Sequence, residues 1–303
     1  MESQEIYDQV IRRYGSIVKS STGNYEQTVA KAFGYTEQEL TGIPEGANLG
    51  LSCGNPTAVA RLREGEIVID LGSGAGLDVF TAAKRVGLTG RAIGVDMNKS
   101  MINKANANKS HVDVSNVEFI HSPITSIPAP DNTADCIISN CVINLVPTED
   151  KQLAFNEMFR LLKPGGRVAI SDILARKELT DEMKKDVALY VGCIAGASQV
   201  SEYDSFLRNA GFEDILIVDT NCDLNVYWTA ADGEPPCCGA EETPSCPSQE
   251  VKHGSNTEQE SYHQSQPSSM ADEASRLANQ LGIADFNEWA GSFQVYAVKP
   301  VTS

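Results

Sequence analysis

Three glycines at alternate positions follow the first strongly apolar segment of the chain. Residues 67–71 read Ile-Val-Ile-Asp-Leu, and Gly72, Gly74 and Gly76 come directly after them. Glycines at this spacing let the backbone turn tightly and approach a ligand, and the helix predicted next offers unpaired N–H groups to it. A second predicted strand ends in Asp96, where a carboxylate can accept both hydroxyl groups of a ribose. We therefore expect a ribose-bearing cofactor.

The later segments follow the order of an open α/β sheet. Further strands are predicted within 116–121, 134–139 and 161–172, and a Leu-Lys-Pro-Gly-Gly turn in the last segment ends a helix and returns the chain to the sheet. This order, with the pattern D-x-G-x-G-x-G from Asp70, resembles the class I S-adenosylmethionine (SAM) methyltransferases. The resemblance implies a Rossmann-like α/β sheet with a C-terminal antiparallel hairpin, and SAM as the cofactor.

The same resemblance assigns roles in SAM binding to residues of this chain. The loop holds the methionine part, Asp96 the ribose, Met97 one face of the adenine and Ile124 or Thr125 its edge, while Asn140 lies beside the methyl donor. The loop residues are Asp70, Gly72, Ser73, Gly74 and Gly76.

Composition limits the class of protein. The 303 residues are 41% hydrophobic, which is enough to bury a full α/β core. The net charge of −17 argues against nucleic acid as a partner, because binding phosphates requires a basic surface. The N-terminus shows neither a basic nor an apolar leader segment, and no apolar run is long enough for a membrane span. We expect a cytoplasmic enzyme without a membrane partner.

The chain has eight cysteines, which we expect to be mostly reduced in a protein without a secretion signal. Cys136, inside a strand, and Cys222, after one, are interpreted as structural or incidental thiols. Cys141 follows the fourth strand, at the edge where open α/β sheets bind ligands. Cys53 lies in a glycine-rich loop before the first strand, and Cys193 lies in the helical segment between strands five and six.

The sequences around these last three thiols resemble the arsenite methyltransferase family. The motifs are Ala-Asn-Leu-Gly-Leu-Ser-Cys-Gly-Asn-Pro at 47–56, Ser-Asn-Cys-Val-Ile-Asn-Leu-Val at 139–146, and Gly-Cys at 192–193. In that family three thiolates bind trivalent arsenic, whose lone pair attacks the methyl group. The resemblance implies that Cys53, Cys141 and Cys193 bind arsenite or methylarsenite as catalytic ligands, for arsenic detoxification, with a small thiol or thioredoxin-type reductant as partner. Soft thiolates suit arsenic better than hard cations, and catalysis by positioning needs no general base.

Two alternatives remain open. A methyltransferase of the same fold acting on a quinone, sterol or secondary metabolite would use the cysteines only for packing. It predicts a larger apolar pocket and activity that survives Cys141→Ser. An arsenic- or metal-sequestering protein that binds SAM without turnover predicts arsenite binding by the cysteines at 237–246 alone.

The N-terminal segment has the pattern of an amphipathic helix over residues 4–14, followed by a helical region over 25–40. Either Tyr7 or Tyr14 closes over SAM as part of a lid, or the helix only packs on the core. Residues 1–52 contain no cysteine, whereas many arsenite-family members carry one there. The number of methyl transfers and the route of re-reduction therefore stay open.

A long insertion precedes the last predicted strand, 293–299, which we expect to pair antiparallel with 212–219. Its composition predicts disorder over 232–270. Cys237 and Cys238, with Cys246, form either an arsenite-capturing arm or an incidental, redox-sensitive cluster. The predicted organisation is a helical lid and glycine-rich loop at 1–60, a SAM-binding core at 61–221 with substrate-roof helices at 176–210, a flexible insertion at 222–270, and a helix with the final strand at 271–303.

Overall fold

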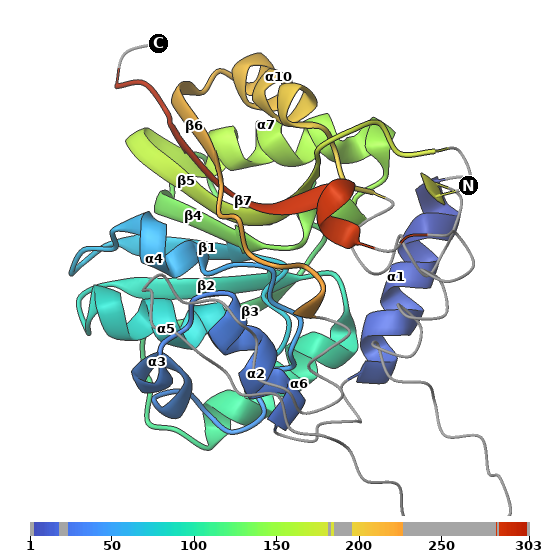
Figure 1. Ribbon diagram of the computed structural model, residues 1–303. Helices are drawn as coiled ribbons and strands as arrows, with labels where there is room; N and C mark the ends of the chain where they lie inside the picture. The colour runs from blue at the N-terminus through green and yellow to red at the C-terminus, as the bar shows by residue number, and fades with distance from the viewer. Residues whose placement is uncertain are drawn as a thin grey trace, which may run out of the picture.

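The computed structural model describes residues 3–17, 24–180, 183–184, 196–226, 283 and 285–301. Within these residues seven strands form one sheet in the order β3-β2-β1-β4-β5-β7-β6. The first five strands are parallel, and β7 runs antiparallel between β5 and β6 (Figure 1). The predicted Rossmann-like sheet with a C-terminal antiparallel pair is confirmed. The strands are β1 (Ile67–Leu71), β2 (Arg91–Asp96), β3 (Val117–His121), β4 (Ala134–Asn140), β5 (Leu162–Ala175), β6 (Glu213–Asp219) and β7 (Ala290–Val298).

Helices cover both faces of the sheet. Alternate side chains of β1 point to opposite faces, so Ile69 and Leu71 pack with α7 and α10, and Val68 packs with α4 and α5. No helix among the described residues is long and apolar enough to cross a bilayer. The helices are α1 (Ser3–Ile17), α2 (Asn24–Ala32), α3 (Glu37–Thr41), α4 (Pro56–Ala60), α5 (Leu77–Val86), α6 (Lys99–Ser110), α7 (Lys151–Leu161) and α10 (Val200–Ala210), with 3-10 turns η1 (Ile143–Leu145), η2 (Thr148–Asp150) and η3 (Phe286–Glu288).

The start of α4 fixes the loop that carries Cys53. The Asn55 side chain caps this helix by accepting a hydrogen bond from the Ala58 N–H, and Pro56 occupies the first helical position, where its missing N–H needs no partner. The Asn55 side-chain amide also donates to the carbonyl of Gly34 (3.2 Å). The loop is thereby tied to the segment that follows α2.

Helix α1 passes across the ends of the parallel strands (Figure 1). It buries Ile6 and Val10, and the Asn98 side-chain amide donates to the carbonyl of Ile11 (2.9 Å). The helix is longer than predicted and continues through Gly15 to residue 17. Contact with the rest of the protein stabilises this end of the helix, since the Asn98 side chain bonds the Ile11 carbonyl and lies beside Gly15. Local propensity alone would end the helix at the glycine.

Several predicted features lie outside the described residues. These are Cys193, most of the 222–270 insertion with Cys237, Cys238 and Cys246, and the helix expected at 271–281.

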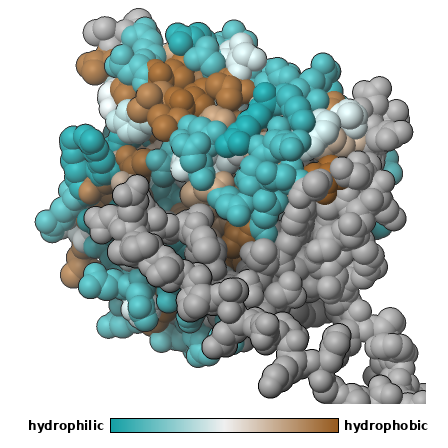
Figure 2. Space-filling model, viewed as in Figure 1, coloured by the Kyte–Doolittle hydropathy of each residue, from teal (hydrophilic) through white to brown (hydrophobic). Residues whose placement is uncertain are grey.

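Strand β6 forms one edge of the sheet and leaves apolar side chains in solvent. Leu216 and Val218 are 58% and 45% exposed. Figure 2 shows apolar surface gathered where Figure 1 places β6 and β7. The helical layers therefore cover the centre of the sheet more completely than this edge.

We expect Arg167→Ala to lower the free energy of unfolding by about 3–5 kcal/mol, measured by urea denaturation. Arg167 is buried, and its guanidinium makes two 2.8 Å contacts with the carboxylate of Glu66. It also donates to the carbonyls of Ala60 and Arg61. The substitution leaves the largely buried Glu66 carboxylate and the carbonyl of Ala60 without their donor.

The matched control is Arg91→Ala, which removes the exposed ion pair between Arg91 and Glu118. Its expected loss is about 1 kcal/mol or less, because solvent screens a surface pair. Equal losses for the two variants would contradict the assigned role of Arg167.

Candidate active site

A pocket opens at the carboxyl-terminal edge of the parallel strands, beneath α1. Tyr7 and Tyr14 of α1 line it, as does Cys141. Gly76 is absent from the lining because it faces inward, where an added Cβ would collide with the rings of Phe80 and Phe119. All the other predicted cofactor residues surround the pocket: Asp70, Gly72, Ser73, Gly74, Asp96, Met97, Ile124, Thr125 and Asn140.

The glycine loop forms a cradle with open space in front of it. A Cβ on Gly72, whose φ is +70°, would collide with the Val142 side chain. A Cβ on Gly74 would instead meet nothing within 4 Å. The Gly74 N–H donates to Asp96 (2.9 Å), which ties the loop to the end of β2. The buried hydroxyl of Ser73 has no hydrogen-bond partner among the described residues, so a polar group is available to a ligand.

Three carboxyl groups line the same pocket, those of Asp70 and Asp78 buried and that of Asp96 half-buried. Burial raises the pKa of Asp70 well above its ordinary value, and the neighbouring charges of Asp78 and Asp96 add to the effect. Burial also raises the pKa of Asp78, to about 6. The pKa of Asp96 is raised by burial too, although N–H groups of Asn98 and Gly74 stabilise its anion. Such a pocket favours a ligand that brings positive charge and hydroxyl donors.

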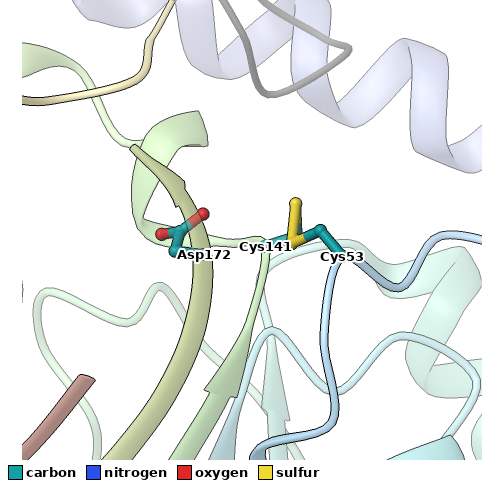
Figure 3. A group of neighbouring side chains, drawn as sticks. All are labelled: Cys53, Cys141 and Asp172. Carbon is teal, nitrogen blue, oxygen red and sulfur yellow. A yellow bond between two sulfur atoms is a disulfide. The ribbon is translucent and has the colours of Figure 1, made fainter. Parts of the chain in front are cut away.

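Cys53 and Cys141 meet at the rim of the pocket, and the Asp172 carboxyl lies beside them (Figure 3). Cys141 follows β4 directly and has a φ of +58°, in the left-handed region, while its N–H donates to the carbonyl of Ser171 (2.9 Å). Its Cα lies 5.8 Å from that of Cys53, and the two residues form a disulfide. The prediction of reduced thiols is therefore wrong for this pair, because the loop and the strand end bring them within bonding range.

The Asn140 side chain connects this thiol pair to the pocket. Its Nδ2 donates to the Tyr35 hydroxyl (2.9 Å), the Gly54 carbonyl (2.9 Å) and Asp78 (3.2 Å). Its Oδ1 accepts from the N–H of Cys53 (3.2 Å). The Tyr35 hydroxyl in turn donates to Asp78 (2.7 Å). One buried amide thus links the Cys53 loop, the segment after α2 and the helix that follows the glycine loop.

Sequence reasoning missed Tyr35, the contacts of Asp78, and Asp172. Asp172 lies at the end of the fifth predicted strand, as Asp96 does in the second, and this position was a usable signal. Tyr35 gave no local signal, since its partner Asp78 is 43 positions away.

Of the remaining cysteines, Cys136 and Cys222 are among the residues that the structure describes. Cys136 is fully buried on the sheet face covered by α5, and burial raises its pKa to about 12. Cys222 is half-buried, with its sulfur 3.8 Å from the carbonyl of Ala32. Cys193 lies outside the described residues. The structure thus brings together two of the three predicted arsenic ligands.

Residues 62–211 match the family model described as a methyltransferase domain. The chain belongs to the class I SAM-dependent methyltransferases. It is 45% identical over 207 residues to an arsenite methyltransferase of Halobacterium salinarum, covering 68% of this chain and 52% of that protein. An arsenite methyltransferase of Aquipseudomonas alcaligenes is 39% identical over 165 residues, covering 52% and 47% of the two chains. The methyltransferase described here therefore spans about half the length of these curated relatives.

A solved structure has the same fold. It is an arsenic(III) S-adenosylmethionine methyltransferase from Chlamydomonas reinhardtii, with a TM-score of 0.52 and 23% identity, covering 90% of this chain and 73% of that one. The resemblance to the arsenite methyltransferases that the cysteine motifs indicated is confirmed by the two sequence relatives.

We expect Tyr35→Phe to lower the free energy of unfolding by about 1.5–3 kcal/mol, because it removes a buried hydrogen bond to a carboxyl group. The measurement is urea denaturation near neutral pH, with Asp78 ionised. Tyr25→Phe is the matched control, since its buried hydroxyl has no partner among the described residues. That variant should be neutral or slightly stabilising. A loss at Tyr25 as large as that at Tyr35 would contradict the importance of the network.

Proposed function

We propose that this methyltransferase transfers a methyl group to trivalent arsenic bound by Cys53, Cys141 and Cys193, in arsenic detoxification. One observation carries the proposal: Cys141 lines the pocket of the cofactor-binding residues and lies within bonding range of Cys53. A substrate held by these sulfurs would therefore lie next to the cofactor. The two curated relatives named arsenite methyltransferases support the choice of substrate.

The residues around the pocket fit SAM. When bound, SAM supplies an electrophilic methyl group carried on a sulfonium sulfur. Asp96 would accept the ribose hydroxyls, and Met97 and Ile124 would contact the adenine. The unpartnered Ser73 hydroxyl and the open space in front of Gly74 suit the methionine part. The buried acids of the pocket favour a cationic ligand.

Arsenite binding requires the Cys53–Cys141 disulfide to be opened. A small thiol or a thioredoxin-type reductant in the cytoplasm would convert it to two thiols and become oxidised to a disulfide itself. Each cysteine thiol then displaces one hydroxyl of arsenite as water and leaves an arsenic–sulfur bond. Thiolates favour this soft centre over hard cations. Cys193 would supply the third sulfur.

The protein would accelerate the reaction by positioning. The left-handed backbone at Cys141 and the hydrogen bond from the Cys53 N–H to Asn140 orient the two thiols at the pocket rim. An arsenic lone pair has no proton to lose, so the residues need not supply a general base. Tyr7, which donates to Asp150 (3.0 Å), would hold α1 over the pocket and limit access of water.

An organic acceptor such as a quinone or sterol is the alternative substrate class. With such a substrate, the meeting of Cys53 and Cys141 beside the cofactor pocket would have no function in catalysis. The experiment below separates the two substrate classes.

We expect Cys53→Ser and Cys141→Ser to lower arsenite methylation by about 100-fold or more, because a serine hydroxyl does not hold arsenic in place for attack. The assay uses purified protein, SAM, excess small thiol and arsenite. Methylated arsenicals are separated chromatographically, and S-adenosylhomocysteine is counted in parallel. SAM affinity, measured by calorimetry, should change little.

Cys136→Ala is the control, because that thiol is buried on the opposite side of the sheet from α7 and away from the pocket. It should keep its activity. Methylation that survives Cys141→Ser, or SAM binding by the unsubstituted protein without methylated arsenic, would overturn the proposal and favour an organic acceptor.

A further inference from the structure

Asp172 adds an oxygen donor to the thiol pair. One ligand atom from each of Cys53, Cys141 and Asp172 lies within 4.8 Å of the others, and all three residues are buried (Figure 3). Asp172 comes from β5, Cys141 from the end of β4, and Cys53 from the loop before α4. Three separate segments thus converge on one point.

We propose that the reduced protein binds a thiophilic divalent cation, with Zn²⁺ as the type ion, through the sulfurs of Cys53 and Cys141 and the carboxylate of Asp172. Two thiolates and one carboxylate form a donor set that suits zinc, and three protein ligands leave a fourth position for water. A dithiol reductant opens the disulfide and is itself oxidised. Cation binding then displaces the two thiol protons into solution.

The surroundings of Asp172 are those of an oriented metal ligand. Its Oδ1 accepts from the side-chain amide of Asn144 (2.9 Å) and from the N–H of Ile173 (3.0 Å). Its Oδ2 accepts from the Tyr203 hydroxyl (3.2 Å). Oδ1 accepts two bonds, whereas Oδ2 accepts one and keeps a lone pair for a cation, and outer hydrogen bonds of this kind fix a ligand's orientation.

The charge balance also fits a bound cation. Zn²⁺ with two thiolates and one carboxylate has a net charge of −1. Lys151 is buried and acts electrostatically on Asp172, while its ammonium donates to the Gly196 carbonyl and the Ser198 hydroxyl. The complex with this lysine would be neutral, which lowers the cost of burying it.

The cation site and the arsenic site share Cys53 and Cys141 but differ in their third ligand. Asp172 adds an oxygen for a divalent cation, whereas the proposed arsenic site uses sulfur throughout. Zinc and arsenite would then compete for the enzyme, and this consequence rests on the function proposed above. The binding of zinc itself is independent of that function.

The test measures Zn²⁺ affinity of the full chain, after reduction with a phosphine that is then removed under anaerobic conditions. All proteins carry Cys237→Ser, Cys238→Ser and Cys246→Ser, so that those thiols do not contribute. We expect one zinc per chain, a loss of this site in Cys53→Ser and Cys141→Ser, and a Kd raised about 10-fold or more in Asp172→Asn. Glu157→Gln, a buried acid of α7 that bonds Arg160 and lies in neither the pocket lining nor the cluster, is the matched control and should bind like the parent.

Co²⁺ absorption separates a ligand role from a structural one. Its thiolate charge-transfer intensity should correspond to two sulfurs in the parent and to three in Asp172→Cys, which should regain tight binding. The proposal would be overturned if the zinc Kd of Asp172→Asn lay within twofold of the parent value. It would also be overturned if Cys193→Ser lost zinc while Asp172→Asn kept it, or if Asp172→Cys added no thiolate charge-transfer signal.

Arsenite displacement distinguishes failure of this inference from failure of the proposed function. Zinc bound as described but not displaced by arsenite would leave the cation site standing and contradict arsenic binding at these thiols. Arsenite methylation by a protein that binds no zinc would support the proposed function and contradict the cation site.

Discussion

The parallel register of β1, β4 and β5 is the constraint on which the site depends. Leu71 pairs with Ser139, and Asn140 pairs with Ser171. Gly72 and Cys141, which follow these pairs, therefore leave the sheet at the same edge, and Asp172 lies beside them within β5, which continues to Ala175 paired with β7. Parallel strands hydrogen-bonded in this register cannot avoid bringing their carboxyl ends together. The cofactor loop, the thiol and the buried carboxyl are neighbours for that one reason.

Buried polar groups organise this edge at some cost to stability. Desolvation disfavours the anions of Asp78 and Asp172 and raises their pKa values to about 6 and about 7. Hydrogen bonds from Tyr35 and Asn140 to the first, and from Tyr203 and Asn144 to the second, partly offset the penalty. The geometry of the site is thus maintained by networks that a purely apolar core would not provide.

The position of Cys53 does not depend on its bond to Cys141 alone. Its N–H donates to Asn140 (3.2 Å), and its carbonyl accepts from the Ser292 hydroxyl of β7 (2.6 Å). Neither of these backbone contacts involves the sulfur atom. The loop can therefore present a thiol in the same place in both redox states, as a substrate or cation site built on this pair requires.

The sequence by itself predicted the order of the strands along the chain, the glycine loop, the place of Asp96 at the end of a strand and the place of Cys141 at the pocket, because each rests on local periodicity or on a short motif. It did not predict the length of α1, which depends on contact with Asn98, nor the roles of Tyr35 and Asp172. It also did not predict the disulfide, whose partners are 88 positions apart. Only the tertiary structure decided these features. Asp172 left a signal in its place at the end of a predicted strand, but its partners, like those of Tyr35 and of the two cysteines, come from distant segments that only the packing of the whole sheet brings together.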